Sequence, residues 1–172
     1  MQSERVISRT DNEQQPYSLL PNPYSPLPIE TIYIIFYNNL MLSITVTPRF
    51  GDVDILRHVN NIVPAQWFEL GRTAVMKFFD PELTLSRETF PLIMAHSEYD
   101  FVGQMFFKDV EIKTWISKIG TKSFTVYHEA WQEGRLCVKG TAVIVHYDFN
   151  TEKSTPIPED KRKLLEQHLK EV

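Results

Sequence analysis

The feature that most constrains this chain is an apolar stretch of helical spacing near its middle, from about Val63 to Phe79. A helix that is apolar nearly all round is normally enclosed by the rest of its domain rather than laid on its surface. Pro64 suits the first helical turn, where its missing N–H donor loses no partner, and Asp80-Pro81 ends the helix. Its apolar residues are Val63, Trp67, Phe68, Leu70, Ala74, Val75, Phe78 and Phe79.

Strand-like segments on both sides of this helix supply the layer that encloses it. Before the helix, apolar and polar residues alternate over 42–46, as in a half-buried strand. After it, segments with strand character occupy roughly 91–99, 107–118, 121–132 and 135–147. Turn signals at Ile119-Gly120 and Glu133-Gly134 predict an antiparallel meander. The last residues, PEDKRKLLEQHLKEV, predict a short terminal helix.

This order of elements predicts an α+β fold in which one long central helix is wrapped by a curved antiparallel sheet of about five strands. Such a sheet leaves open edges. Pairing an edge with a second copy of the chain is the common way to cover it, so we expect a homo-oligomer.

Length, charge and cysteine content exclude several classes of protein. The 172 residues correspond to one globular domain, at most with a tail. A net charge of -4 with mixed signs argues against nucleic-acid binding, which needs a concentrated basic face. Cys137 has no partner for a disulfide or a structural zinc site, which fits a reducing cytoplasm. The longest apolar run, residues 32–37, is far below the roughly 18 to 20 residues of a membrane span.

The N-terminal part of the chain differs in composition from the rest. Residues 1–28 are polar and aperiodic, with prolines at 16, 21, 23, 26 and 28. Residues 29–40 are ambiguous between a strand and a docking segment. We therefore expect residues 1–40 to be a proline-rich extension, disordered or loosely docked, and residues 41–172 to form the folded domain.

A cluster of polar residues lies directly before the central helix. Such residues are commonly caps and turn formers, and Asn60 or Asn61 would then satisfy the unpaired N–H groups of the first helical turn. The alternative is a catalytic loop, because a helix N-terminus offers donors to a developing oxyanion. A carboxylate beside it can act as general base or nucleophile on a carbonyl. The cluster consists of Asp52, Asp54, Arg57, His58, Asn60 and Asn61.

Other polar residues have alternative interpretations. His58 is either an acid/base group or a hydrogen-bond partner of the loop backbone. Glu69 forms a helix-surface pair with Arg72, three positions later, or it is partly buried beside the loop. His96 and His128 fall on predicted strands and are interpreted as structural. The sequence has no zinc-binding, nucleophile-elbow or phosphate-loop motif, so we expect no metal and no cofactor.

The segment RFGDVDILRHVNN followed by VPAQWFELGR resembles the signature of the hotdog-fold acyl-CoA thioesterases, the group that includes 4-hydroxybenzoyl-CoA thioesterase. In that group an aromatic residue and a D-x-D element lead through a turn like G-H-V-N-N into a central helix with E-x-x-R. The predicted strand order matches from about Met41 to Tyr147. The resemblance implies a hotdog fold, hydrolysis of an acyl-CoA to free acid and coenzyme A, and a homodimer, often paired into a tetramer, with the reaction at the subunit interface.

The resemblance also implies roles for individual residues. Asp54, the second aspartate of D-x-D, matches the catalytic carboxylate, and the backbone N–H at about Asn61 matches the donor that polarises the thioester carbonyl. His58 and Asn60 match residues that shape the pocket or hold water, and Asp52 matches a residue that orders the loop. The predicted catalytic residues are thus Asp54, His58 and Asn61, and the predicted substrate-binding residues are Arg57, Asn60 and Glu69.

Two positions depart from the patterns of related groups. Relatives usually have glycine where this chain has Arg57. Pairing with Asp54 would lower the pKa of that carboxylate, whereas an outward orientation would let Arg57 meet a phosphate of the coenzyme. Leu56 stands where the acyl-carrier-protein thioesterases of this fold have asparagine, which argues against their catalytic set. The alternative function is a non-catalytic acyl-CoA-binding or regulatory hotdog protein.

Overall fold

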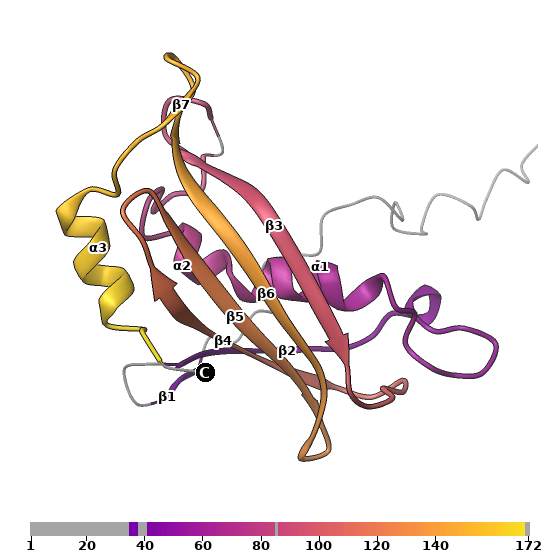
Figure 1. The fold of residues 1–172 in the computed structure, drawn as a ribbon. Helices are drawn as coiled ribbons and strands as arrows, with labels where there is room; N and C mark the ends of the chain where they lie inside the picture. Colours follow the sequence, from indigo (N-terminus) through magenta and orange to yellow (C-terminus); the bar gives the residue numbers. More distant parts are fainter. Residues whose placement is uncertain (1–34, 38–40, 85, 171–172) are drawn as a thin grey trace, which may run out of the picture.

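The computed structural model of this protein describes residues 35–37, 41–84 and 86–170. Its main layer is one antiparallel sheet with the strand order β1-β2-β4-β5-β6-β3, and β7 pairs with β6 (Figure 1). Five strands are long and two are short. The long strands are β2 (Met41–Val46), β3 (Leu92–Phe101), β4 (Val110–Ile119), β5 (Ser123–Gln132) and β6 (Arg135–Asp148); the short ones are β1 (Ile35–Tyr37) and β7 (Lys153–Ser154).

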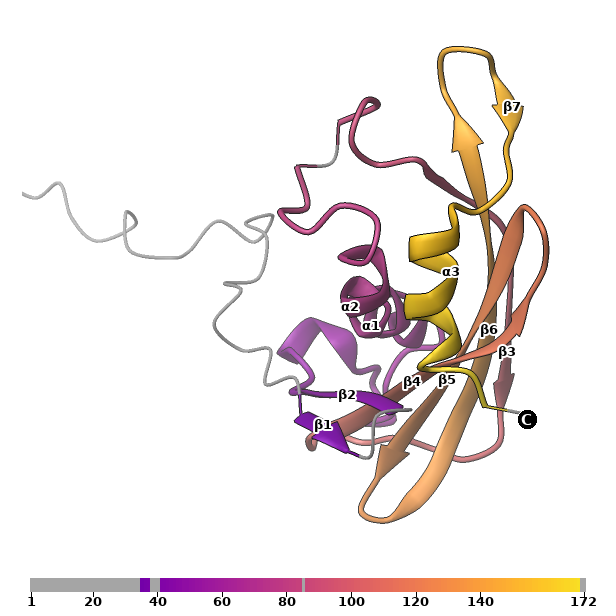
Figure 2. The ribbon, with the colours of Figure 1, turned by 90° about the vertical axis from the view of Figure 1, so that its left-hand side faces the viewer.

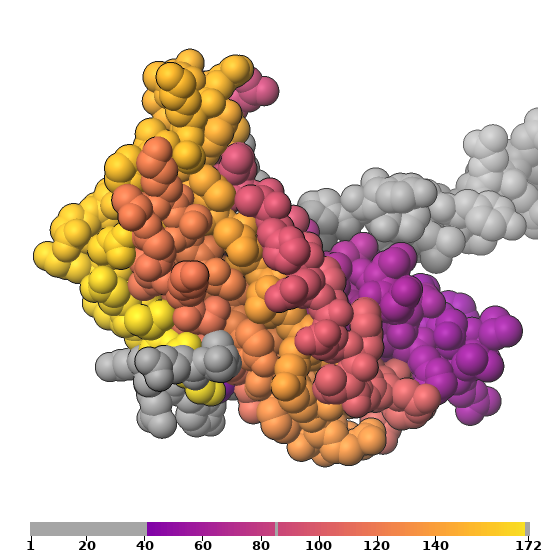
Figure 3. Space-filling model, in the orientation of Figure 1, coloured from indigo at the N-terminus to yellow at the C-terminus, as the bar shows by residue number. Residues whose placement is uncertain are grey.

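The helices pack on one face of this sheet, which curves around them (Figure 2). The elements are the 3-10 turn η3 (Phe50–Asp52), α1 (Val63–Gly71), α2 (Thr73–Met76) and α3 (Glu159–Glu166). Figure 3 shows the opposite face, where β3, β6 and β5 lie side by side with no described helix over them. The predicted α+β fold, a curved antiparallel sheet around a central helix, is confirmed.

The strand connections follow the predicted meander only in part. β4, β5 and β6 pair in sequence order, as the two turn signals predict. β3, however, pairs antiparallel with β6, from Leu92 opposite His146 to Phe101 opposite Val138, and not with β4, which follows it in the chain. The meander therefore covers three strands, and β3 forms one edge of the sheet because the chain crosses from one side of the sheet to the other between β3 and β4.

Alternation along the strands produces two buried clusters under the helices. In β5 every second residue from Phe124 to Gln132 is buried, which is the period of a strand with one covered face. One cluster joins α1 to the sheet through side chains such as Trp67 and Phe68, and the other joins α2 and α3 to it through Val75 and Leu165. Burying one such large side chain contributes about 1.5–3 kcal/mol.

The predicted continuous helix over 63–79 is wrong in one respect. It is divided at Arg72, which caps α1 with φ -82° and ψ -2° and precedes α2. Gly71, a poor helix former, faces the sheet here so closely that a Cβ would lie 2.8 Å from Ile112 and Thr114 side-chain atoms. The break lets the chain after Gly71 follow the curvature of the sheet.

The prediction for residues 1–40 falls almost entirely outside the described part of the chain. Within it the structure describes only β1, which pairs antiparallel with β2, with Ile35 opposite Ser43 and Tyr37 opposite Met41. The domain boundary at residue 41 stays a prediction. No helix in the described ranges combines the length and the apolar character that crossing a membrane requires.

The close approach of α1 to β6 generates a stability prediction. A Cβ on Gly140 would lie 2.6 Å from Cε2 of Phe68, a fully buried ring that is also stacked on His128. We expect Gly140→Ala to lower the free energy of unfolding by about 1–3 kcal/mol, since the ring has no free space to move into. Chemical denaturation measures this. Gly51→Ala, where nothing lies within 4 Å, is the matched control; equal losses in both variants would contradict the prediction.

Candidate functional site

Residues 52–60 form a closed loop that projects from the N-terminal end of α1 (Figure 1). Backbone hydrogen bonds close it at two levels: Asn60 N–H donates to the Asp52 carbonyl (2.8 Å) and Asp54 N–H donates to the His58 carbonyl (2.8 Å). Between these levels Val53 and Val59 form an isolated antiparallel bridge. The loop thus has two short arms and an exposed tip at 55–57.

Asp52 anchors the first arm of the loop. Its side chain is buried, and it accepts hydrogen bonds from the backbone N–H of Arg49 (2.8 Å) and from Nη2 of Arg49 (3.0 Å). The carboxylate therefore ties the loop to the residues that follow β2. This contact agrees with the loop-ordering role that the resemblance implies for Asp52.

Asp54 lies on the same arm but is exposed to solvent. Its Oδ1 accepts hydrogen bonds from the backbone N–H groups of Leu56 (2.8 Å) and His58 (3.0 Å). One carboxylate oxygen therefore holds the loop tip in shape. No hydrogen bond from the described residues reaches Oδ2, which leaves this oxygen accessible to water or a ligand.

Arg57 occupies the tightest position of the loop tip. Its φ is 66°, in the left-handed region that favours glycine. Its N–H donates to the Asp54 carbonyl (3.0 Å), and its exposed side chain makes no ion pair within 4.0 Å with a carboxylate of the described residues. Of the two alternatives for Arg57, the pair with Asp54 is thus not formed in this structure.

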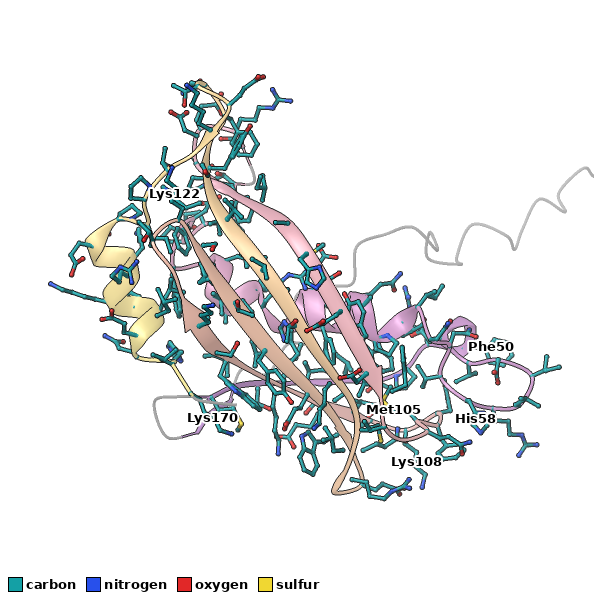
Figure 4. The ribbon with its side chains drawn as sticks, in the orientation of Figure 1. Phe50, His58, Met105, Lys108, Lys122 and Lys170 are labelled. Carbon is teal, nitrogen blue, oxygen red and sulfur yellow. The ribbon has the colours of Figure 1, made fainter. Side chains whose placement is uncertain are left out.

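His58 and Val59 brace the second arm against the connection between β3 and β4. Val59 N–H donates to the carbonyl of Met105 (2.8 Å), a buried residue, and the His58 ring stands edge-on to Phe106, with ring centroids 5.3 Å apart. Figure 4 shows His58 at the base of the projecting loop with Met105 beside it. The loop is thereby fastened at both ends, to the segment that follows β2 and to the one that precedes β4.

The start of α1 carries no side-chain cap. Its N-cap residue is Ile62, and the turn into the helix is closed by Val63 N–H donating to the Asn60 carbonyl (3.0 Å). The capping role considered for the side chains of Asn60 and Asn61 is therefore not observed. Within the described residues, the N–H groups of Asn61 and Ile62 donate to no protein oxygen, so donors remain available at the helix mouth.

Large apolar side chains surround this polar loop on the surface. An exposed cluster of this size on one end of a domain indicates a surface that binds an apolar ligand or another protein. The members lie on the loop and its flanks, at the end of β3 and on the connection that follows it: Phe50, Ile55, Leu56, Ile62, Phe101, Val102 and Phe107.

Glu69 does not lie at the loop. It lies on α1, eight residues after Asn61 and about 12 Å from it along the direction of the helix, and its side chain is exposed. The alternative that Glu69 is partly buried beside the loop is therefore wrong. The structure brings together Asp54, Arg57, His58, Asn60 and Asn61, and it separates Glu69 from them.

A second polar group lies under the C-terminal end of α1, at residues that were not predicted as a site. Arg72 is only 8% exposed, and burial lowers its pKa, an effect that the charge of nearby Glu69 partly opposes. His128 is buried beside it, with Nδ1 2.9 Å from Oγ1 of Thr114, and burial followed by the Arg72 charge lowers the pKa of its imidazole to about 3. An arginine inside an otherwise apolar helix was the available signal.

The backbone of Arg57 generates a stability prediction. A left-handed φ costs a non-glycine residue about 1–2 kcal/mol, whereas glycine adds about 0.4–1 kcal/mol of entropy to the unfolded chain. We expect Arg57→Gly to raise the free energy of unfolding by up to about 1 kcal/mol. In the control Arg87→Gly, an exposed position without a positive φ, stability should fall instead. Denaturant titrations that rank the two variants in the opposite order would refute the strain at Arg57.

Burial of His128 generates a pH prediction. Below pH 6.5 the unfolded chain protonates this imidazole, while the folded chain keeps it neutral down to about pH 3. Stability is therefore present in full above pH 6.5 and is lost as pH falls toward 3, at about 1.4 kcal/mol per pH unit. Unfolding free energies between pH 7 and 4 should show this slope together with that of the carboxyl groups whose pKa values are lowered in the fold, because both act in the same direction. In His128→Gln the slope should be smaller; an identical slope would contradict the assignment.

Comparison with known proteins identifies the family. The sequence profile of the thioesterase-like superfamily matches residues 48–167. A structure from Bacillus stearothermophilus, described as a predicted thioesterase, is 37% identical, covers 77% of this chain and 98% of its own, and superposes with a TM-score of 0.73. A thioesterase from Thermus thermophilus, complexed with coenzyme A and zinc, is 26% identical over 72% of this chain and 95% of its own, with a TM-score of 0.64.

More distant structures share the architecture. A mutant 4-hydroxybenzoyl-CoA thioesterase in complex with 4-hydroxybenzoyl-CoA is 15% identical, covers 73% of this chain and 98% of its own, and has a TM-score of 0.62, which shows a common fold. The predicted hotdog fold is confirmed by this architecture. On the profile match over 48–167 and the relative at 37% identity, the chain belongs to the thioesterase-like superfamily.

Proposed function

We propose that this protein hydrolyses an acyl-CoA thioester to a free acid and coenzyme A. The observation that carries the proposal is one closed loop that presents the exposed Asp54 carboxylate and leads directly into the open N–H donors of Asn61 and Ile62. Thioester hydrolysis needs both parts, a base or nucleophile and a set of donors for the oxyanion.

In this mechanism Asp54 acts through its free oxygen. Asp54 takes a proton from water as the water oxygen adds to the thioester carbonyl carbon, and the N–H groups at Asn61 stabilise the resulting oxyanion. The C–S bond then breaks, and the coenzyme A thiolate receives the proton. Because Oδ1 is held by the N–H groups of Leu56 and His58, Oδ2 is presented in a fixed direction, which favours the productive geometry.

Asp54 can also add directly to the carbonyl and form an acyl anhydride, which water then cleaves. A single turnover in ¹⁸O-labelled water identifies an anhydride that water opens at the Asp54 carbonyl. Direct attack places ¹⁸O in the product acid, whereas water attack on the Asp54 carbonyl of an anhydride transfers an unlabelled enzyme oxygen to the product.

The remaining residues of the loop provide substrate contacts in this proposal. Arg57, exposed and without an ion-pair partner in the described chain, binds a phosphate of the coenzyme. His58 and Asn60 line the entrance, and the exposed apolar side chains around the loop receive the acyl group. The coenzyme A complex of the Thermus thioesterase and the 4-hydroxybenzoyl-CoA complex of the 4-hydroxybenzoyl-CoA thioesterase support this class of ligand.

We also propose that the protein acts as a homodimer, or as a dimer of dimers, in the cytoplasm. β3 is an edge strand of ten residues that pairs with β6 on one side, and none of the described strands pairs with its other side. Long exposed edges of this kind favour pairing with another strand. Cys137, a buried free thiol, fits a reducing compartment.

The test is release of free thiol from a panel of acyl-CoAs that spans short, long and aryl acyl groups. We expect Asp54→Asn to lower kcat/KM roughly 10²–10⁴-fold, the usual contribution of a general acid–base group. The amide oxygen of asparagine can still accept the two loop N–H groups, so the loop shape is retained. Asp109→Asn is the matched control and should keep full activity. This exposed carboxylate accepts a hydrogen bond from the Thr47 hydroxyl, as the amide oxygen of asparagine still can.

Two results would overturn parts of the proposal. A parent protein that releases thiol from none of the panel would remove the hydrolase function. If such a protein still bound acyl-CoA in calorimetry, the non-catalytic binding function would replace it. Full turnover by Asp54→Asn would remove Asp54 from the mechanism while leaving the reaction class intact.

A further inference from the structure

The guanidinium of Arg72 is buried without the anion that it needs. Its Nη2 contacts only the sulfur of Met94 (3.8 Å), a weak acceptor, and its Nη1 is buried with no hydrogen-bond partner in the described part of the chain. Taking a charged group out of water is strongly unfavourable unless a partner of opposite charge meets it. Arg72 is therefore incomplete in a single copy of the chain.

The chain's own nearest carboxylate does not complete it. Glu69 lies one helical turn before Arg72 and influences its pKa through its charge. It is exposed, and the described side chains include no ion pair between these two residues within 4.0 Å. Glu69 and Arg72 are therefore neighbours on α1 that do not pair. Glu69 is an exposed anion, and Arg72 is a buried cation.

Two side chains of α1 reach β3, the open edge of the sheet. Phe68 stacks on Tyr99 of β3, with ring centroids 5.9 Å apart, and Arg72 reaches Met94 of the same strand. The edge strand exposes 52% of Met94 and 54% of Phe101, large apolar side chains that remain in contact with water in a single copy. The edge therefore combines open backbone groups, apolar surface and an unsatisfied cation.

A second copy of this chain fits all three features. Two β3 strands that pair antiparallel about a twofold axis cover each other's open edge with the same surface. Residue numbers rise along α1 as they fall along β3, because Phe68 lies against Tyr99 and Arg72 against Met94. The midpoint of β3 (Leu92–Phe101) therefore lies opposite the part of α1 between Glu69 and Arg72.

A twofold axis at that midpoint brings Glu69 of one copy toward Arg72 of the other. Measured along α1, Glu69 of one copy then lies within about one residue of Arg72 of the other, which corresponds to about 1.5 Å. We propose that the two copies exchange reciprocal Glu69–Arg72 ion pairs, two per dimer, which complete the buried guanidinium and set the register of the β3–β3 pairing. The inference rests on the homodimer of the proposed function and names the contact that specifies it.

Register is the property that such a pair can specify. A slip of one residue between antiparallel strands turns every side chain to the other face of the sheet. A buried charge that finds its partner in one register only makes every other register costly, which is the best-supported use of buried polar groups at interfaces. Apolar residues such as Met94 and Phe101 provide area without this selectivity.

The first experiment measures the dissociation constant of the dimer by sedimentation at a series of protein concentrations. Glu69→Gln removes both ion pairs and leaves an exposed position of the single copy otherwise unchanged. We expect the dissociation constant to rise roughly 100-fold or more, since each disrupted buried charge pair typically weakens association by at least tenfold. Glu98→Gln, at an exposed carboxylate on the edge strand β3, is the control and should change the dissociation constant less than about threefold.

The second experiment separates pairing between copies from pairing within one. A Glu69→Arg chain carries two cations and an Arg72→Glu chain two anions, so each should be monomeric alone. Mixed, they should form a heterodimer, because the charges complement each other only across the interface. If the Arg72→Glu chain does not fold, the Glu69→Gln measurement decides.

A parent that stays monomeric, or a Glu69→Gln dimer as tight as the parent's, overturns this inference. Thiol release by such a protein would leave the proposed hydrolysis standing. Conversely, an intact dimer that is weakened by Glu69→Gln but releases no thiol from any acyl-CoA would support the ion pairs and remove the hydrolase function.

Discussion

The packing of Phe68 against the inner face of the sheet is the contact on which the rest of the structure depends. Its ring lies between His128 of β5 and Tyr99 of β3, over a glycine of β6 that leaves room for it. Three strands that follow α1 in the sequence thereby meet one of its side chains. The height and direction of α1 follow from this contact, and with them the position of the helix mouth and of the loop before it.

The projecting loop is held in place by hydrogen bonds to the segments beside it. Asp52 fastens one arm to Arg49 behind β2, and Val59 fastens the other to Met105 before β4. Between these anchors the side chain of Asp54 orders the tip. A site built in this way loses little conformational entropy when substrate binds, because most of the loop geometry exists before binding.

Local patterns in the amino-acid sequence predicted most of the strands and the position of the loop. Strand-like patterns located β2, β3, β4, β5 and β6, and the polar cluster before the helix located the loop. The pairing of β3 with β6 and the helix break at Arg72 depend on the curvature of the sheet, which no local pattern contains. Likewise, D-x-D pointed to Asp54, but the hydrogen bonds that Asp54 accepts and the left-handed φ of Arg57 arise only when the loop closes.

The irregularity in β3 has a consequence for association. The register of β3 against β6 shifts between Met94 and His96, so the edge strand is bent in its middle and does not present a uniform ladder of backbone groups. A straight edge can recruit strand after strand and grow into a fibre. A bent one accepts a partner of matching shape and then stops, so aggregation through this edge is disfavoured even though it exposes apolar side chains such as Met94 and Phe101.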